Sequence, residues 1–228
     1  MTQSEGGLCI VVPAFNEAEI VCDVVTRLRV LHPFVVVVDD GSSDGTGGAA
    51  LRAGAIVLRH PINLGQGAAI QTGIEFALRQ GAAMVCTFDA DGQHDVADIG
   101  RMVEALGVAG AEVALGSRFL GSAPGMPWHR RVLLRLAIWY TRLTTRLPIT
   151  DAHNGLRLLT AFAASKIRIT QNRMAHASEI LDCVARSRLT LVEVPVTITY
   201  SAYSMRKGQK SADALNVLAD LIIGKFRN

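Results

Sequence analysis

The stretch CTFDADGQHD, residues 86–95, brings three carboxylates, a glutamine and a histidine together directly after an apolar run. Carboxylates this close repel one another unless a positive group lies among them. Mg²⁺ in proteins is commonly held by one or two carboxylates together with substrate phosphates and waters. Asp89 and Asp91 fit that requirement, and Gln93 adds a neutral oxygen. The stretch therefore indicates a divalent-cation site, although an Asp-x-Asp pair is by itself a common pattern.

Two neighbouring features have structural interpretations as well as functional ones. His94 is expected to be a turn residue or a hydrogen-bond partner, and Asp95 the N-cap of the next helix. The loop NLGQG, residues 63–67, opens a helix, where glycines let a backbone approach closely and the helix N-terminus favours phosphate. It matches neither a Walker A loop nor a Rossmann loop. Packing explains its glycines as well as ligand contact does.

Two earlier polar sets also follow apolar runs. Residues 8–12 and 34–38 read as buried strands; the first leads into PAFNE and the second into DDGS. Residues 84–88 form a third such strand, which ends at Asp89. In parallel α/β sheets, ligands bind outside the carboxyl ends of the strands. We therefore expect all three polar sets at one edge of one sheet.

The rest of the pattern alternates between strands and helices. It predicts an α/β fold with a mostly parallel central sheet and helices on both faces. The 228 residues suit one domain with a C-terminal extension. Helices are expected at residues 16–30, 46–53, 64–80, 96–106, 126–147, 161–167 and 176–186, further strands at 55–58, 112–116, 189–194 and 196–200, and a polar loop at 150–157.

Composition excludes several classes of protein. Half of the residues are apolar, which supports a sizeable core and argues against disorder. The four cysteines form no CxxC pair, which fits a reducing cytosol and argues against a disulfide framework or a zinc site. The sequence shows no signal-peptide pattern and no apolar run of the roughly 20 residues that span a bilayer. Any membrane contact is expected to be peripheral. The net charge of +3 is a weak signal by itself, and no nucleic-acid partner is expected.

The segment between residues 113 and 150 contains six arginines and no Asp or Glu. On the helix expected at 126–147, at about 100° per residue, four of them fall within a stripe of roughly 60° beside an apolar sector. An ordinary solvated face usually mixes charges of both signs. Because this stripe carries positive charge alone, it favours binding of an anion or of a membrane surface. The arginines of this stripe are Arg131, Arg135, Arg142 and Arg146.

Five motifs occur in order along the chain: VVPAFNE at residues 11–17, VDDGSSDGT at 38–46, NLGQG at 63–67, DADGQ at 89–93 and GSR at 116–118. Together they resemble a family 2 glycosyltransferase with the GT-A (nucleotide-diphospho-sugar transferase) fold. Within that family the chain is similar to the dolichyl-phosphate mannosyltransferase and polyprenyl-phosphate glycosyltransferase branch. The resemblance spans residues 8 to about 210. We expect a GT-A domain at residues 1–210. The residues of 211–228 predict an amphipathic helix without a transmembrane segment, although this branch often carries C-terminal transmembrane helices.

The resemblance also implies a site for a nucleoside-diphosphate sugar and for Mg²⁺ or Mn²⁺. The basic loop YSMRKGQK, residues 203–210, departs from the eukaryotic spacing and is closer to bacterial members, which leaves open which of its cations acts. The family pattern assigns the nucleotide sugar to Pro13, Phe15, Glu17, Asp39, Asp40, Asp89, Ala90, Arg206 or Lys207, and Lys210, the metal to Asp89, Asp91 and Gln93, and a contact with the sugar or its phosphate to Arg118.

The implied reaction is a single displacement that inverts the anomeric centre, with GDP-mannose or a UDP-sugar as donor. A polyprenyl or dolichyl phosphate is the expected acceptor; a phosphate monoester is ionised near neutral pH and needs little help from a base. Arg131 and Arg135 are the expected phosphate contacts, with Arg130 a further candidate, because guanidinium groups match phosphate oxygens. A sugar hydroxyl of a glycan or glycolipid would need a base. Asp151 and Glu179 are candidates for it, and each also has a structural interpretation.

Two other functions fit parts of the pattern. A nucleotidyltransferase also combines an α/β sheet with metal-bound acids, but a glycine-rich loop with Arg and Lys would stand where this chain has PAFNE. A non-catalytic nucleotide-sugar-binding module would keep the fold, but acids at all three strand ends favour an enzyme. We expect a cytoplasmic protein, peripheral on the inner face of the cell membrane. It would act alone, as a homo-oligomer or with a membrane-anchor partner.

Overall fold

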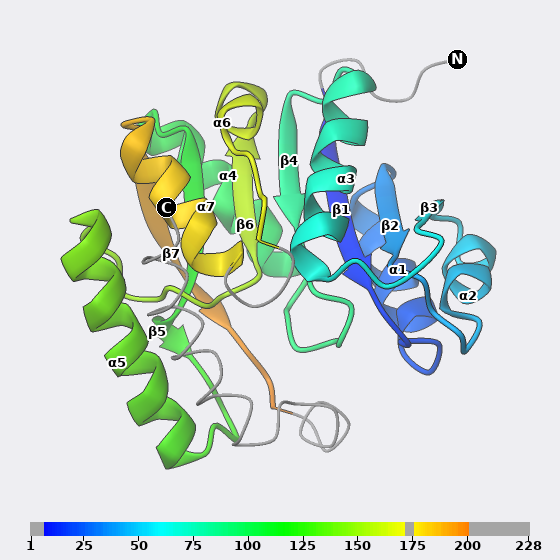
Figure 1. Ribbon diagram of the computed structural model, residues 1–228, viewed down its shortest axis with the longest axis horizontal. Helices are drawn as coiled ribbons and strands as arrows, with labels where there is room; N and C mark the ends of the chain where they lie inside the picture. Colours follow the sequence, from blue (N-terminus) through cyan, green and yellow to red (C-terminus); the bar gives the residue numbers. More distant parts are fainter. Residues whose placement is uncertain (1–6, 172–175, 201–228) are drawn as a thin grey trace.

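A seven-stranded sheet forms the centre of the computed structural model, which describes residues 7–171 and 176–200 (Figure 1). Its strands are β1 (Leu8–Ala14), β2 (Val35–Asp39), β3 (Ile56–Arg59), β4 (Met84–Thr87), β5 (Val113–Ser122), β6 (Arg157–Thr160) and β7 (Leu191–Thr197). They lie in the order β3-β2-β1-β4-β6-β5-β7, and only β6 runs antiparallel to its neighbours. The mostly parallel α/β sheet expected from the sequence is confirmed.

Helices cover both faces of this sheet (Figure 1). Successive residues of a strand point to opposite faces, so Cys9 and Val11 join one buried apolar cluster while Ile10 and Val12 join the other. The first cluster is closed by α3 (Gln66–Arg79), α5 (Trp128–Thr145), α6 (Ala161–Lys166) and α7 (His176–Arg186), and the second by α1 (Val21–Leu31), α2 (Thr46–Arg52) and α4 (Ala97–Ala109).

The carboxyl ends of β1, β2 and β4 lie side by side. Ala14 of β1 is in register with Asp39 of β2, and Val11 is in register with Thr87 of β4. Pairing continues past the end of β2, because the N–H of Asp40 donates to the carbonyl of Ala14 over 2.9 Å. The three polar sets therefore meet at one edge of the sheet, as the parallel pattern predicts.

Three details differ from the expected elements. The first helix begins at Val21 rather than at residue 16, because Asn16 has a φ of 53°, outside the helical region. Pro195 does not interrupt the last strand; β7 runs through it at the edge of the sheet, where a missing N–H is tolerated. The polar loop expected at residues 150–157 already enters β6 at Arg157.

Two expected features, the basic loop at 203–210 and the helix at 211–228, lie outside the described residues. They and the domain boundary at residue 210 stay predictions. Of the helices in residues 7–171 and 176–200, none combines the length and the hydropathy of a membrane span.

Candidate active site

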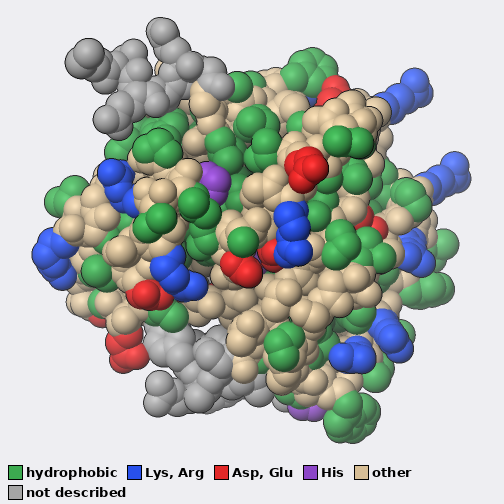
Figure 2. All heavy atoms as spheres, turned by 180° about the vertical axis from the view of Figure 1, so that it is seen from behind, with side chains coloured by type: hydrophobic (Ala, Val, Ile, Leu, Met, Phe, Trp, Pro, Cys, Tyr) green, Lys and Arg blue, Asp and Glu red, His purple; other side chains and the backbone are tan. Residues whose placement is uncertain are grey.

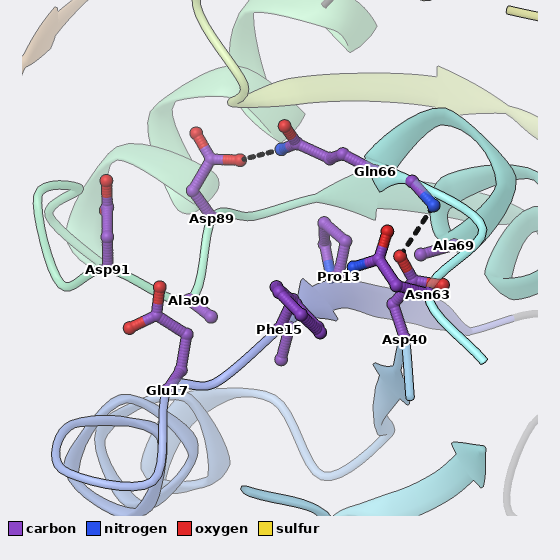
Figure 3. Close-up of a pocket in the computed structure, with 12 residues that line it drawn as sticks. Pro13, Phe15, Glu17, Asp40, Asn63, Gln66, Ala69, Asp89, Ala90 and Asp91 are labelled. Carbon is purple, nitrogen blue, oxygen red and sulfur yellow. Dashed lines mark hydrogen bonds between the residues drawn. The ribbon is translucent and has the colours of Figure 1, made fainter. Parts of the chain in front are cut away.

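A cavity of about 480 Å³ opens at the carboxyl ends of β1, β2 and β4 (Figure 3). Pockets of this size hold small ligands and cofactors. Asn63, Gly65 and Gln66 of the NLGQG loop contribute to its wall. Gly67 has a packing role, because a Cβ atom there would clash with the carbonyl of Gln171. The lining residues are Pro13, Ala14, Phe15, Glu17, Asp40, Asn63, Gly65, Gln66, Ala69, Asp89, Ala90 and Asp91.

The two adjacent aspartates after β2 have different surroundings. Asp40 lines the cavity, and its carboxylate accepts hydrogen bonds from the backbone N–H groups of Leu64 (2.9 Å) and Gly65 (2.7 Å) and pairs with His60 Nδ1 (2.7 Å). Asp39 is buried away from the cavity wall and accepts from the N–H of Ser42 over 2.9 Å. Asp40 therefore fixes the NLGQG loop against the cavity, while Asp39 fixes the turn that follows β2.

Asp89 is surrounded by hydrogen-bond donors and positive charge. Gln66 Nε2 donates to Oδ1 over 3.0 Å (Figure 3), and His94 Nε2 lies 3.1 Å from Oδ2. Burial raises the pKa of Asp89, but the hydrogen bond from His94 and the charges of His94, His176 and Arg157 outweigh it and hold this pKa below its usual value. Asp89 is therefore ionised at neutral pH without a metal.

Two of these neighbours were not expected from the sequence. Arg157 is buried at the start of β6, and burial lowers its pKa to about 10. His176 is buried at the start of α7. Gly155 allows the backbone to lie directly beside Asp89, since any side chain at this position would clash with the carboxylate of Asp89. Only the charge of Arg157 inside the apolar run LRLL could have signalled this cluster.

Asp91 lies in a more negative environment. Burial, followed by the charges of Asp89 and Glu17, raises the pKa of Asp91 to about 6, although His94 and a hydrogen bond from the N–H of Gln93 (3.0 Å) act in the opposite direction. Figure 3 shows Glu17 and Asp91 on the same side of the cavity, from the loops after β1 and β4. A bound cation would relieve this repulsion.

The two carboxylates fit a cation whose remaining ligands come from a substrate and from water. Within residues 7–171 and 176–200, no group of three or more His, Cys, Asp or Glu side chains is arranged to hold a metal. Two carboxylates completed by phosphate oxygens and waters are the arrangement that Mg²⁺ accepts. Gln93, expected as a third ligand, does not line the cavity; its backbone N–H and carbonyl bond to Asp91 and Thr199.

The pKa of Asp91 gives a testable pH dependence. Affinity for Mn²⁺, measured by calorimetry with a saturating nucleotide sugar, should fall up to tenfold per pH unit below about pH 6, because the protonated carboxyl is no ligand. Asp91→Asn is the control and should bind weakly with no such dependence between pH 5 and 7. Equal pH profiles for the two proteins would rule out Asp91 as the titrating ligand.

Arg118, the expected sugar contact, and Asp151, one of the two expected bases, form a buried ion pair with each other. Arg118 Nε donates to Asp151 Oδ2 over 2.6 Å, and its other guanidinium nitrogens donate to Tyr200 Oη (2.9 Å) and the carbonyl of His153 (2.6 Å). Arg118 is 6% and Asp151 3% exposed, and neither lines the cavity. This places Asp151 as the partner of Arg118 rather than as a base facing a ligand. Tyr200 was missed because its partner lies 82 residues away.

Glu179, the other candidate base, also has a structural position. From α7 its carboxylate accepts the backbone N–H groups of Thr170 (3.0 Å) and Gln171 (2.8 Å). It does not line the cavity. The geometry favours the structural interpretation of this residue.

His94 is the hydrogen-bond partner expected of it, whereas the N-cap position of α4 is held by Val96 rather than by Asp95. His94 is a buried hydrogen-bond partner of Asp89. Asp95 Oδ1 accepts the N–H of Ala97 over 3.0 Å at the start of α4. Asp95 thus directly precedes Val96, the N-cap. Both residues therefore shape the acidic loop without lining the cavity.

The structure separates the three acceptor-phosphate candidates on α5. The guanidinium of Arg130 lies 5.0 Å from the centre of the Tyr200 ring, next to the Arg118 ion pair. Arg131 and Arg135 are exposed, and Arg135 borders a separate hollow of about 310 Å³. Arg206, Lys207 and Lys210 lie outside the described residues. The hollow is lined by Phe119, Arg135, Ile138, Trp139, Arg142 and Thr150.

α5 also exposes an apolar surface beside its arginines. Trp128 is 77% and Trp139 64% exposed. In Figure 2, α5 runs along the right-hand edge, where basic and hydrophobic side chains lie next to one another. The exposed apolar residues of α5 are Trp128, Val132, Leu136, Trp139 and Leu143, which we call the apolar stripe.

Comparison with known proteins identifies the family. The profile of glycosyl transferase family 2 matches residues 9–168. The polyprenol monophosphomannose synthase of Mycolicibacterium smegmatis is 32% identical, over 83% of this chain and 76% of that protein. The UDP-N-acetylglucosamine–dolichyl-phosphate N-acetylglucosaminyltransferase of Methanococcus voltae is 29% identical, over 95% of each chain.

A solved structure shows the same fold. Mycobacterium tuberculosis glucosyl-3-phosphoglycerate synthase, in complex with Mn²⁺, uridine-diphosphate-glucose and phosphoglyceric acid, superposes with a TM-score of 0.71 over 95% of this chain and 79% of that chain, at 17% identity. The architecture is the GT-A fold of that enzyme. The family match, the relatives and the fold agree with the cavity at the strand ends: this chain belongs to glycosyl transferase family 2, in the branch of the polyprenyl- and dolichyl-phosphate enzymes, and is a glycosyltransferase.

Proposed function

We propose that this glycosyltransferase moves a sugar from a nucleoside-diphosphate sugar, GDP-mannose or a UDP-sugar, to a polyprenyl or dolichyl phosphate. Mg²⁺ or Mn²⁺ is the cofactor, and the anomeric centre is inverted. The observation that carries the proposal is the cavity, whose wall is apolar at Pro13 and Phe15 and acidic at Asp89 and Asp91. The apolar part suits a nucleotide base, and the acidic part suits a cation bound to a diphosphate.

On the donor side, Phe15 is 44% exposed and offers an aromatic surface to the base. Asp40 and Glu17 line the same cavity and accept hydrogen bonds from base or ribose. Asp39 does not line the cavity and holds the turn after β2 through the N–H of Ser42. Asp91, with Asp89, would hold the Mg²⁺ or Mn²⁺, which neutralises charge on the leaving diphosphate when bound. A relative crystallised with Mn²⁺ and uridine-diphosphate-glucose supports this assignment.

On the acceptor side, relatives named for polyprenol and dolichyl phosphates support a lipid phosphate. A phosphate oxygen forms the new bond to the anomeric carbon while the bond from that carbon to the nucleoside diphosphate breaks, and the diphosphate takes the electron pair. This nucleophile is already ionised and needs no base. The engagement of Asp151 with Arg118, and of Glu179 with backbone N–H groups, is compatible with such a reaction.

A lipid acceptor requires access to a membrane, and α5 supplies a suitable surface. Its arginines attract anionic headgroups, and the exposed tryptophans and leucines of the apolar stripe enter the boundary with the acyl chains. The protein is accordingly peripheral, on the cytoplasmic face of the cell membrane.

Leu136→Glu should lower binding to vesicles of phosphatidylglycerol and phosphatidylcholine at least tenfold in a flotation assay. The substitution places a negative charge in the apolar stripe, where Leu136 is 53% exposed. Val108→Glu is the matched control, because Val108 is 85% exposed on α4, away from this surface. Equal losses for both variants, or none for Leu136→Glu, would exclude α5 as the membrane contact.

The function is tested with purified protein, Mn²⁺, a panel of labelled GDP- and UDP-sugars and a short polyprenyl phosphate. A lipid-linked sugar from one donor is expected, and Asp91→Ala should abolish it. Product that survives Asp91→Ala would refute the metal role of Asp91. Metal-dependent binding of UDP or GDP without product from any donor would point to a different acceptor.

A further inference from the structure

Tyr200 occupies the junction between the acidic loop and α5. The residue is 8% exposed and follows β7. The N–H of Thr199 donates to the carbonyl of Gln93 over 2.9 Å, and the N–H of Tyr200 donates to that of Pro124 over 3.2 Å. Gln93 belongs to the acidic loop, and Pro124 belongs to the connection between β5 and α5. The backbone of Tyr200 is therefore fixed from both sides.

The hydroxyl of Tyr200 is held by the buried ion pair. It accepts a hydrogen bond of 2.9 Å from Arg118 Nη1. The guanidinium of Arg118 is in turn fixed by Asp151 and by the carbonyl of His153. Because Asp151 compensates the charge of Arg118, this buried group contributes little net charge to its surroundings.

The ring of Tyr200 supports a second guanidinium. Arg130, on the first turn of α5, lies 5.0 Å from the ring centre, within the range of a cation–π contact. Among the described residues, no carboxylate forms an ion pair with Arg130 within 4.0 Å. Its charge is therefore held in place by an uncharged aromatic face, which leaves its N–H groups able to bind an anion.

We propose that Tyr200 is a positioning residue that holds Arg130 against the phosphate of the lipid acceptor. This inference rests on the proposed function and selects Arg130 from the three candidate arginines of α5. Arg131 and Arg135 are exposed, and Arg135 borders the hollow beside Trp139. They serve the membrane surface, whereas Arg130 is joined through Tyr200 to the loops around the cavity.

The experiment measures dissociation constants of a water-soluble isoprenyl phosphate, farnesyl phosphate, by calorimetry. Affinity for UDP or GDP with Mn²⁺ is measured in parallel, and thermal melting checks the fold of each variant. Tyr200→Leu removes the ring, Tyr200→Phe keeps it and removes the hydroxyl, Arg130→Ala removes the cation, and Arg135→Ala is the matched control on the same helix.

Tyr200→Leu and Arg130→Ala should each weaken farnesyl phosphate binding roughly tenfold, and the double variant should be no weaker than Arg130→Ala within about twofold, because both changes remove one contact. Tyr200→Phe and Arg135→Ala should stay within about threefold of the original protein. Nucleotide affinity should not change in any variant.

Additive losses in the double variant, a parallel loss of nucleotide affinity, or a loss in Tyr200→Phe as large as in Tyr200→Leu would overturn the inference. If metal-dependent nucleotide binding is intact and Arg130→Ala leaves farnesyl phosphate affinity unchanged, the inference is wrong while the proposed function stands. If the original protein binds nucleotide but no isoprenyl phosphate, the proposed acceptor is wrong, and the inference with it.

Discussion

Asp91→Asn is expected to lower the rate of sugar transfer at least a hundredfold and, in the absence of divalent cations, to raise the melting temperature. The rate falls because charge stabilisation by a metal is worth several kcal/mol, and about 1.4 kcal/mol corresponds to a factor of ten. The melting temperature rises because asparagine removes the cost of burying the Asp91 charge and its repulsion with Asp89 and Glu17. The amide oxygen can still accept the N–H of Gln93.

The sign of the stability change follows from the pKa. Asp91 has a pKa of about 6 in the folded protein, against about 3.9 in an unfolded chain. The folded state therefore binds more protons between these values, and stability falls as the pH rises from about 4 to about 6. The loss at pH 7.5 is about 3 kcal/mol, which corresponds to a shift of roughly 10 °C for a chain of this size.

A comparison of the two melting temperatures at low pH is the control. At about pH 4 Asp91 is largely protonated in the folded protein, so the two proteins should melt within about a degree of each other there. Calorimetry in a chelating buffer at pH 4 and pH 7.5 measures the difference directly. Equal melting temperatures at pH 7.5 would show that Asp91 carries no electrostatic penalty.

Asp151→Ala is expected to destabilise the protein by about 3–5 kcal/mol, because it leaves the guanidinium of Arg118 buried without its partner. The melting temperature should fall by roughly 10 °C. The buried side chains of this pair (5% and 0% exposed) distinguish it from the exposed pair of Arg27 and Asp23. Asp23→Ala is therefore the matched control and should cost less than about 1 kcal/mol.

A double variant separates the loss of the pair from the loss of packing. Arg118→Met with Asp151→Ala removes both charges and should be more stable than Asp151→Ala alone, since the uncompensated charge is gone. Unfolding in urea gives the free energies of the original protein, of Asp151→Ala and of the double variant. If the double variant is the less stable of the two, packing rather than charge dominates this site.

The sequence predicted the edge of the sheet where the site lies, because the position of a strand end follows from its local pattern. Each apolar run ended in acids, and parallel pairing brings such ends together. Which of two adjacent aspartates faces the cavity could not be predicted in the same way. Asp39 and Asp40 are distinguished by contacts with Ser42 and with Leu64 and Gly65, which depend on how two loops turn after β2 and β3.

The sequence did not predict the polar groups that pair over long distances. Arg118 meets Asp151 and Tyr200 over separations of 33 and 82 residues, and no periodicity records such contacts. The strand at Arg157 was missed for a related reason. It is short, follows a polar loop and enters the sheet antiparallel, whereas the alternating pattern predicts parallel strands.

The antiparallel β6 has a consequence for how this enzyme can diversify. It stands between β4 and β5. Among residues 7–171 and 176–200, those that line the cavity precede Gly92, whereas β5, α5 and β7 follow it in the chain. Substitutions on β5, α5 and β7 can therefore change the surface around α5 without altering the described wall of the cavity. Chimeras that exchange residues 110–200 and keep the basic loop predicted at 203–210 should exchange acceptor preference and retain donor preference.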